Sequence, residues 1–244
     1  MKNDFKVVLF DLGNTLIYDD PASWADVYIR ADRSLWSSLH KFGVNISTHE
    51  LFGDHKTLLD YYYELREGDL DEPGIGTVLR DLLNEHKIEL SDEKLQSALR
   101  SMYAVTQTNW FIEDDAIPTL QVLLKSNYRL GIISNGSDDS NTYELLDKTS
   151  LRTYFEFIIS SAAFGKRKPH PGIFRAAIDH FQILPEQTVM IGDNYEADIL
   201  GARYHGMNTI WITRRLSSPS GDPWIQEETV VSKLSEIPAL LSSQ

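Results

Sequence analysis

The sequence predicts an α/β protein with a parallel sheet, interrupted after the first strand by an all-helical domain. After residue 115, short apolar runs alternate with helical patterns, as they do in βαβ units. Residues 20–110 show only helical spacing, without strand-like alternation. The chain has 244 residues, of which 42% are hydrophobic and 24% charged, so one large domain with an insertion fits its length.

The first expected strand is the apolar run at residues 7–10, which ends abruptly in Asp11. A fully buried strand of a parallel sheet shows such a continuous apolar run. Open α/β sheets bind their ligands outside the carboxyl ends of the strands. A carboxylate at this position is poorly solvated and needs a partner or a chemical task. Asp11 is therefore a candidate nucleophile or metal ligand.

Four helices are expected in the insertion, because apolar residues recur there at helical spacing. They cover residues 24–39, 51–65, 79–83 and 95–103. We expect Trp24 and the run Tyr61-Tyr62-Tyr63 to pack in the core of this domain or against the rest of the protein. A domain inserted beside the carboxyl end of the first strand is well placed to act as a lid.

The second half of the chain begins with Glu113-Asp114-Asp115, which we expect to face solvent. Strands are then expected at 129–133, 157–160, 188–191 and 209–212, and helices at 118–125, 143–147, 173–181, 196–204 and 230–241, with a connection at 213–228. This alternation indicates a Rossmann-like parallel sheet with helices on both faces. Residues 1–19 and 111–244 would form this core, and residues 20–110 a helical cap.

Composition and charge exclude several classes of function. The formal net charge of −13 disfavours binding to nucleic acid or to an anionic membrane. The absence of cysteine excludes disulfides and thiolate catalysis. No apolar run reaches ~18 residues and residues 1–5 are polar, so we expect no membrane span, no signal peptide and a cytoplasmic location. The sequence makes no prediction about oligomeric state.

Polar residues follow the apolar runs at several expected strand ends. Asp11, Ser134 and Asp193 end three of the runs, and Lys168 lies in a basic turn before a helix. In a parallel sheet these ends converge on one edge. Two carboxylates in close contact need a cation between them, and Mg²⁺ is the hard ion that fits Asp11 and Asp193. Lys168 and Ser134 would then complete a phosphate-sized pocket around a carboxylate nucleophile.

This ordered set of motifs resembles the haloacid dehalogenase-like hydrolase superfamily, in the subfamily with a helical cap inserted between the first and second motifs. The resemblance covers roughly residues 5–213 and includes Ser134-Asn135-Gly136 and Gly192-Asp193. It implies that Asp11 is the nucleophile that forms an aspartyl intermediate. It also implies that Asp11, the backbone carbonyl of Gly13 and Asp193 bind magnesium.

The resemblance assigns further roles. Asp198 matches the acid that supports the metal site, and Thr15 matches the threonine that steadies the first loop. Ser134 matches the hydroxyl that binds the transferred group, and Asn135 beside it is a substrate-binding candidate. Lys168 matches the lysine of the third motif, because Pro169 and a helix follow it; Lys166 is the alternative.

Gly13 departs from the family pattern. Phosphatases of this family carry a second aspartate two residues after the nucleophile, which protonates the leaving oxygen and later activates water. General acid–base catalysis contributes ~10²–10⁴-fold to a rate, so its loss slows the reaction without abolishing it. A water molecule or a nearby side chain, namely Asn14, Asp19 or Asp20, could partly substitute.

Three functions remain open. The first is a magnesium-dependent phosphatase that acts on a small phosphorylated metabolite. The second is a binding or regulatory protein that retains the fold with little turnover. The third is a 2-haloacid dehalogenase. The dehalogenases of the family also lack the second aspartate and work without metal, and they place an aromatic hydroxyl at the position of Gly13 and a cap arginine near the halide. Arg30 and Arg33 are cap arginines of this chain.

Overall fold

A central parallel sheet organises the protein. The computed structural model describes residues 4–52, 57–66, 70–215 and 229–242. Within them, six strands form one sheet in the order β5-β4-β1-β6-β7-β8, and every neighbouring pair is parallel. The strands are β1 (Val7–Phe10), β4 (Arg129–Ser134), β5 (Phe157–Ser160), β6 (Thr188–Gly192), β7 (Asn208–Ile212) and β8 (Val230–Val231). The predicted α/β class is confirmed.

Strand β1 lies at the point where the strand order reverses. It pairs with β4 on one side and with β6 on the other. The chain runs from β1 to β4 and β5 on one side and then crosses to β6, β7 and β8 on the other side. Open α/β sheets bind ligands at the carboxyl ends of the strands where the order reverses in this way. Asp11 is the residue that follows β1.

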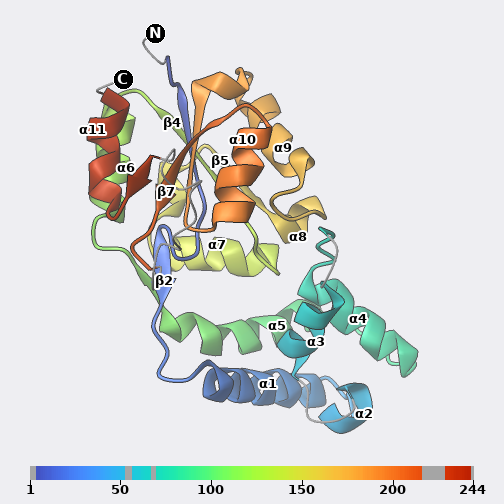
Figure 1. The fold of residues 1–244 in the computed structure, drawn as a ribbon. Helices are drawn as coiled ribbons and strands as arrows, with labels where there is room; N and C mark the ends of the chain where they lie inside the picture. The colour runs from blue at the N-terminus through green and yellow to red at the C-terminus, as the bar shows by residue number, and fades with distance from the viewer. Residues whose placement is uncertain (1–3, 53–56, 67–69, 216–228, 243–244) are drawn as a thin grey trace.

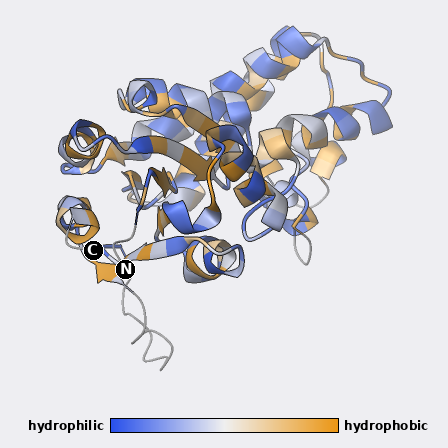
Figure 2. Ribbon diagram, turned by 90° about the horizontal axis from the view of Figure 1, so that it is seen from above, coloured by the Kyte–Doolittle hydropathy of each residue, from blue (hydrophilic) through white to orange (hydrophobic). Residues whose placement is uncertain are grey.

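Helices cover both faces of the sheet (Figure 1). Helices α6 (Ala116–Lys125) and α11 (Ile237–Ser242) lie on one face, and α9 (Pro171–Phe181) and α10 (Gly201–Tyr204) lie on the other. Helices α7 (Asp139–Lys148) and α8 (Ser161–Phe164) complete the core. The strands are largely orange in Figure 2, whereas the surrounding helices carry both orange and blue stretches, as expected for helices with one face in the core.

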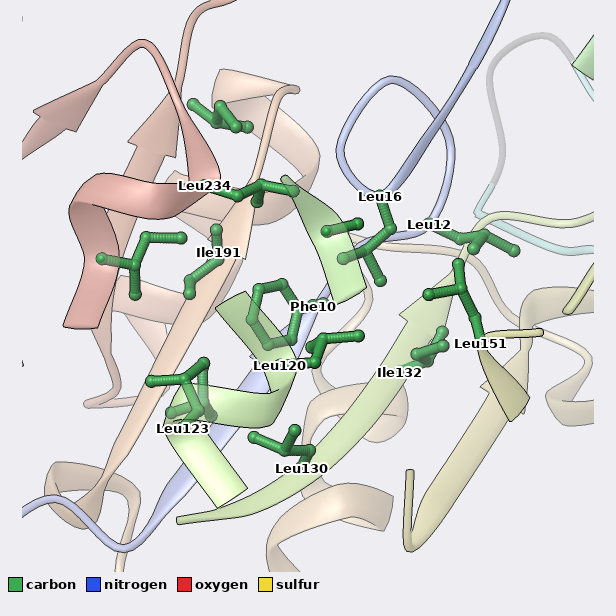
Figure 3. Close-up of a cluster of buried hydrophobic side chains, with 14 of the residues drawn as sticks. Phe10, Leu12, Leu16, Leu120, Leu123, Leu130, Ile132, Leu151, Ile191 and Leu234 are labelled. Carbon is green, nitrogen blue, oxygen red and sulfur yellow. The ribbon is translucent and has the colours of Figure 1, made fainter. Parts of the chain in front are cut away.

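The side chains of β1 divide between the two apolar clusters. Val8 and Phe10 pack in one cluster, and Val7 and Leu9 pack in the other, and all four are fully buried. Figure 3 shows Phe10 among Leu120 and other side chains of the first cluster. Burial of one such side chain contributes about 1.5–3 kcal/mol, so the strand that carries Asp11 is fixed from both sides.

The cap has an apolar core of its own. Its helices are α1 (Trp24–Lys41), α2 (Thr48–Phe52), α3 (Leu58–Leu65), α4 (Ile75–Glu85) and α5 (Asp92–Thr106). The expected single helix at 51–65 is wrong. Thr57 has an extended backbone and its hydroxyl accepts a hydrogen bond from the amide of Asp60, so a new helix begins there.

A two-stranded antiparallel ribbon joins core and cap (Figure 1). Strand β2 (Ile17–Asp19) pairs with β3 (Trp110–Ile112), although about ninety residues separate them in sequence. Neither strand is predicted from the sequence, because both are short and their pairing is non-local. The division of the chain into 1–19, 20–110 and 111–244 stays a prediction, and the ribbon lies at its two boundaries.

Two further expectations near the C-terminus are wrong. Glu113 is buried rather than solvent-exposed, because the guanidinium groups of Arg214 and Arg215 pair with its two oxygens. Residues 230–241 do not form one helix, since Val230–Val231 joins the sheet edge and α11 begins only at Ile237. Most of the expected connection at 213–228 lies outside the described residues. Within the described part of the chain, no helix combines the length and apolar composition needed to cross a bilayer.

Candidate active site

The candidate residues gather at the carboxyl edge of the parallel sheet. Asp11 follows β1, Ser134 ends β4, and Asp193 follows β6. Lys168 lies in the loop between α8 and α9. All four side chains line one cavity of about 440 Å³. Residues from four separate parts of the sequence therefore share a space large enough for a small ligand.

Lys168 is the buried centre of this group. Its Nζ lies 2.6 Å from Asp11 Oδ1, 2.6 Å from Asp198 Oδ1 and 2.6 Å from the carbonyl oxygen of Ile133. Three acceptors match the three N–H donors of an ammonium group. Burial lowers the pKa of Lys168, but the carboxylates of Asp11 and Asp198 outweigh this effect and raise the pKa overall. The lysine is therefore charged and fixed in place.

Asp198 lies on a π-helix formed by Tyr195–Leu200. Asn194 caps this helix through a hydrogen bond from the amide of Ala197 to its side chain. Asp198 Oδ2 accepts from the amide of Asn194 at 3.0 Å, while its Oδ1 is held by Lys168. Both carboxylate oxygens are therefore engaged within the protein. Single π-helical turns are frequent at functional sites.

Gly192 makes room for the Asp198 side chain. A Cβ atom at residue 192 would lie 2.2 Å from Asp198 Oδ2 and 2.5 Å from its Cβ. Any larger residue would displace the carboxylate from Lys168. A glycine is therefore needed at residue 192 to leave the Asp198 carboxylate in contact with Lys168.

Asp193 completes a compact group of carboxylates. Asp11, Asp193 and Asp198 each offer an oxygen within 4.8 Å of the others. Burial, reinforced by the negative charges of Asp11 and Asp198, raises the pKa of Asp193 to about 7, although Lys168 acts in the opposite direction. Burial is also the main reason that the pKa of Asp198 is raised, to about 6. One lysine does not offset three carboxylates, so the group favours an additional cation.

The donor set fits a hard divalent ion such as Mg²⁺, which prefers oxygen ligands. Both oxygens of Asp198 already accept hydrogen bonds, which suits a supporting role. Asp11 and Asp193 are then the carboxylates best suited to direct ligation, and Gly13 lines the same cavity. These positions agree with the sequence-based assignment of ligands and supporting acid, which remains a prediction.

Ser134 and Asn135 contribute in different ways. Ser134 is buried at the end of β4 and lines the cavity. The side-chain amide of Asn135 accepts from the Lys168 amide at 2.8 Å and donates to the Lys168 carbonyl at 3.1 Å. Asn135 therefore positions the lysine loop, and its direct contact with substrate stays a prediction.

Gly13 has an aromatic neighbour in place of an acid. A Cβ atom at residue 13 would lie 3.6 Å from the ring of Trp110 on β3, which is ordinary contact. Of the suggested substitute groups, Asn14 and Asp19 line the cavity. Asp19 accepts a hydrogen bond from the indole of Trp24.

The remaining candidates lie apart from the cavity lining. Thr15 is fully buried, and its hydroxyl has no hydrogen-bond partner among the described residues. Lys166 forms an ion pair with Asp71 of the cap, and its side chain is 37% exposed. Of the two lysine candidates, the structure brings Lys168 to the carboxylates.

Cap residues close the cavity on the side opposite the sheet edge. Among the cap aromatic residues, Tyr62 packs in the cap core and Trp24 packs beside Trp110 of β3, as expected, whereas Tyr63 is half-exposed. Trp24 and Tyr63 line the cavity. Trp24 stacks on Tyr28 with ring centroids 5.1 Å apart. These aromatic groups form an apolar wall beside the charged sheet edge.

Sequence reasoning missed two arginines in the lining, Arg66 and Arg167. The proximity of Arg167 to Lys168 in sequence was a usable signal. No local sequence pattern indicated Arg66, because its position in the cavity depends on how the cap folds and docks. Arg30, by contrast, is exposed on α1, and Arg33 lines a different cavity within the cap.

Known proteins resemble this chain over most of its length. A family model for haloacid dehalogenase-like hydrolases matches residues 5–206. A glyceraldehyde 3-phosphate phosphatase from Pyrococcus furiosus is 27% identical over 206 residues, which cover 84% of this chain and 80% of that protein. An N-acylneuraminate-9-phosphatase from Mus musculus is 27% identical over 250 residues, which cover 98% and 94%, respectively.

A solved structure extends the similarity to the fold. The 2-haloacid dehalogenase from Pseudomonas syringae pv. Tomato DC3000 superposes with a TM-score of 0.68 at 26% identity. The match covers 98% of this chain and 99% of that chain, so it includes both the core and the cap.

Proposed function

This chain belongs to the haloacid dehalogenase-like hydrolases, and we propose that it is a magnesium-dependent phosphatase that hydrolyses a small phosphate monoester through a phosphoaspartate on Asp11. Among its relatives, the proteins from Pyrococcus furiosus and Mus musculus are phosphatases of small phosphorylated compounds by name. Family membership alone does not choose the reaction, so the proposal depends on the site.

The observation that carries the proposal is the contact between Lys168 Nζ and Asp11 Oδ1 at 2.6 Å, at the carboxyl end of β1. The lysine holds one carboxylate oxygen of Asp11, and Asp11 lines the cavity together with Ser134 and Asp193, so the other oxygen would be the attacking one. An oriented carboxylate next to a positive charge and a hydroxyl donor is the arrangement that nucleophilic phosphoryl transfer requires.

In the proposed reaction, the free Asp11 oxygen attacks phosphorus while the ester oxygen leaves with the bonding electrons and takes up a proton. Lys168 and the Ser134 hydroxyl offset the charge on the phosphoryl oxygens. Water then attacks the phosphoaspartate and releases phosphate and the Asp11 carboxylate. Asp11, Asp193 and the Gly13 carbonyl would hold Mg²⁺, which supplies positive charge for the phosphate when bound.

The proton for the leaving oxygen has no side-chain donor at residue 13. Asp19 is the carboxyl group of the cavity lining that best suits this role, since Asn14 cannot act as an acid at neutral pH. Good leaving groups need less protonation. We therefore expect aryl phosphates to be hydrolysed faster than alkyl phosphates.

Hydrolysis of an aryl phosphate with and without chelator tests the proposal. We expect activity that disappears on removal of divalent cations and returns with Mg²⁺. Asp11→Asn should reduce kcat to background, whereas Asp81→Asn, an exposed substitution on α4, should not change it. Full phosphatase activity in a pure Asp11→Asn preparation would rule the mechanism out.

A dehalogenase is the second candidate, favoured by the structural match to a 2-haloacid dehalogenase at 26% identity. The indole of Trp110, rather than an aromatic hydroxyl, lies beside Gly13. Halide release from a 2-haloacid that is insensitive to chelator would support this candidate. Silence in both assays would favour a binding or regulatory protein.

A further inference from the structure

Two arginines, one from the cap and one from the core, line the cavity. Arg66 follows α3 in the cap, and Arg167 directly precedes Lys168 in the core. Both belong to the lining that also contains Asp11. The mechanism proposed above uses neither of them.

Arg66 is held in a defined orientation. Its Nη1 donates to the hydroxyl of Tyr62 at 3.0 Å. Its guanidinium lies over the rings of Tyr62 and Tyr63, with 4.9 Å and 5.0 Å to the centroids. The side chain is only 11% exposed, and its buried Nε has no hydrogen-bond partner among the described residues. A fixed, buried guanidinium thus retains unused N–H donor capacity.

Charge in this part of the cavity wall is not balanced. The nearby carboxylate of Glu72 lies 3.7 Å from Arg66, too far for a hydrogen bond, and its other oxygen accepts from Ser161. Burial lowers the pKa of both arginines, and the charge of Arg66 lowers that of Arg167 further. Two guanidinium groups therefore share one buried carboxylate.

Desolvated like charges are costly unless an anion joins them. Lys168 is committed to the reacting end of the cavity, where its Nζ contacts Asp11, Asp198 and a backbone carbonyl, so a second anionic group needs other donors. The planar donor fork of arginine matches carboxylate and phosphate oxygens. The cavity, about 440 Å³, has room for a ligand that extends beyond one phosphoryl group.

We propose that Arg66 and Arg167 bind a second anionic group of the substrate, so that the preferred substrate is a phosphate monoester that also carries a carboxylate or a second phosphate. This inference rests on the proposed phosphatase function. Because Arg66 belongs to the cap and Arg167 to the core, both domains would take part in selecting the substrate.

Matched substrates test the inference. The series consists of ω-phosphooxy carboxylates with short alkyl chains, their neutral primary amides, and bisphosphates of the corresponding diols. We expect kcat/KM for the best charged member to exceed that of its amide by about tenfold to hundredfold, the range of a charge-assisted hydrogen-bond pair. A preference for carboxylate or for bisphosphate identifies the anion. Equal values for charged and neutral members at every chain length would overturn the inference.

Arginine variants locate the effect. Arg66→Met and Arg167→Met should each bring the charged-to-neutral ratio close to one, and Arg66→Lys should restore part of it. Arg30→Met is the control, because Arg30 is an exposed cap arginine outside the cavity. If Arg66→Met fails to fold, Arg167→Met still decides. Retention of the ratio in a folded Arg167→Met protein would contradict the inference.

Binding to an inactive protein separates this inference from the proposed function. In Asp11→Asn, calorimetry should show the charged ester binding more tightly than its amide, and addition of Arg167→Met should remove the difference. Preferential binding without turnover by the wild type would leave the anion site standing and reject the phosphatase. Turnover of the phosphate esters without any preference for the charged ones would support the phosphatase and reject the second anion site.

Discussion

Lys168 is the residue that joins the separate motifs. Its ammonium group contacts the carboxylates of Asp11, which follows β1, and Asp198, which lies on the π-helix. It also contacts the carbonyl oxygen of Ile133 in β4. Such a buried group contributes little net stability, but removal of one partner leaves uncompensated charge behind. The position and charge of Asp11, the proposed nucleophile, thus depend on one side chain.

Exchange of Lys168 for methionine should be far more harmful than the same exchange at Lys166. We expect Lys168→Met to lower the free energy of unfolding by about 3–5 kcal/mol, because Asp11 and Asp198 lose their partner. Lys166→Met removes a largely exposed ion pair and should cost less than about 1 kcal/mol. Denaturant titration of both variants measures the difference. Similar losses for the two would contradict the central role of Lys168.

Gly13 is the residue at which an acid can be introduced. A Cβ atom there meets only the Trp110 ring at ordinary contact distance, so a side chain fits. Gly13→Asp should raise kcat for alkyl phosphates by up to about 10²-fold and change aryl phosphates less, because only poor leaving groups need the proton. Gly13→Ala provides the steric control. An equal gain in kcat for alkyl and aryl phosphates would contradict the explanation that the missing acid at residue 13 slows the departure of poor leaving groups.

Helix α1 of the cap holds a carboxylate that is partly withdrawn from solvent. Asp32 is half-buried on this helix, and its Oδ1 has no hydrogen-bond partner among the described residues. Burial raises the pKa of Asp32 to about 6. The folded state therefore binds this proton more tightly than the unfolded state, and stability falls as pH rises from about 4 to 6.

Asp32→Asn should remove this pH dependence. Below about pH 4 the wild type and the variant should have similar melting temperatures, since the carboxyl group is protonated in both folded and unfolded states. Above pH 6 the variant should be more stable. Thermal melts at several pH values measure the difference. A difference that is constant from pH 4 to 8 would contradict the assignment.

Elements differ in how far the sequence predicts them. Strands β1 and β5 have the expected bounds, because each is a continuous apolar run. Strand β1 is fully buried, as such a run predicts, whereas β5 is a half-buried strand at the sheet edge. Strands β2 and β3 have only three residues each and pair across the whole cap, so no local pattern identifies them. Glu113 was wrongly predicted to face solvent, because its partners Arg214 and Arg215 lie about a hundred residues away in sequence.

On the scale of the whole molecule, the candidate site follows from sheet topology. Asp11, Ser134 and Asp193 were predictable from their positions after apolar runs, because parallel strand ends share an edge. Arg66 and Trp110 were not, since they reach the cavity through the cap and the connecting ribbon. Local patterns therefore predict the chemistry at the sheet edge better than the cap residues that select a substrate.

Backbone contacts couple the cap to the lysine loop. The amide of Glu72 donates to the carbonyl of Gly165, and the amide of Arg167 donates to the carbonyl of Leu70. The cap segment thus lies against the loop that leads to Lys168. In this arrangement the cap closes the cavity and the core supplies Asp11, the proposed nucleophile, which suits a reaction that must exclude water during the first step.

Borohydride trapping shows most directly whether Asp11 becomes phosphorylated. Borohydride reduces an acyl phosphate to an alcohol, which converts the modified aspartate to homoserine. With substrate, Mg²⁺ and borohydride present, mass spectrometry of the peptide that contains residue 11 should show homoserine there, and only when substrate is added. Active enzyme that yields unmodified Asp11, or homoserine at another aspartate, would contradict a phosphoaspartate on Asp11.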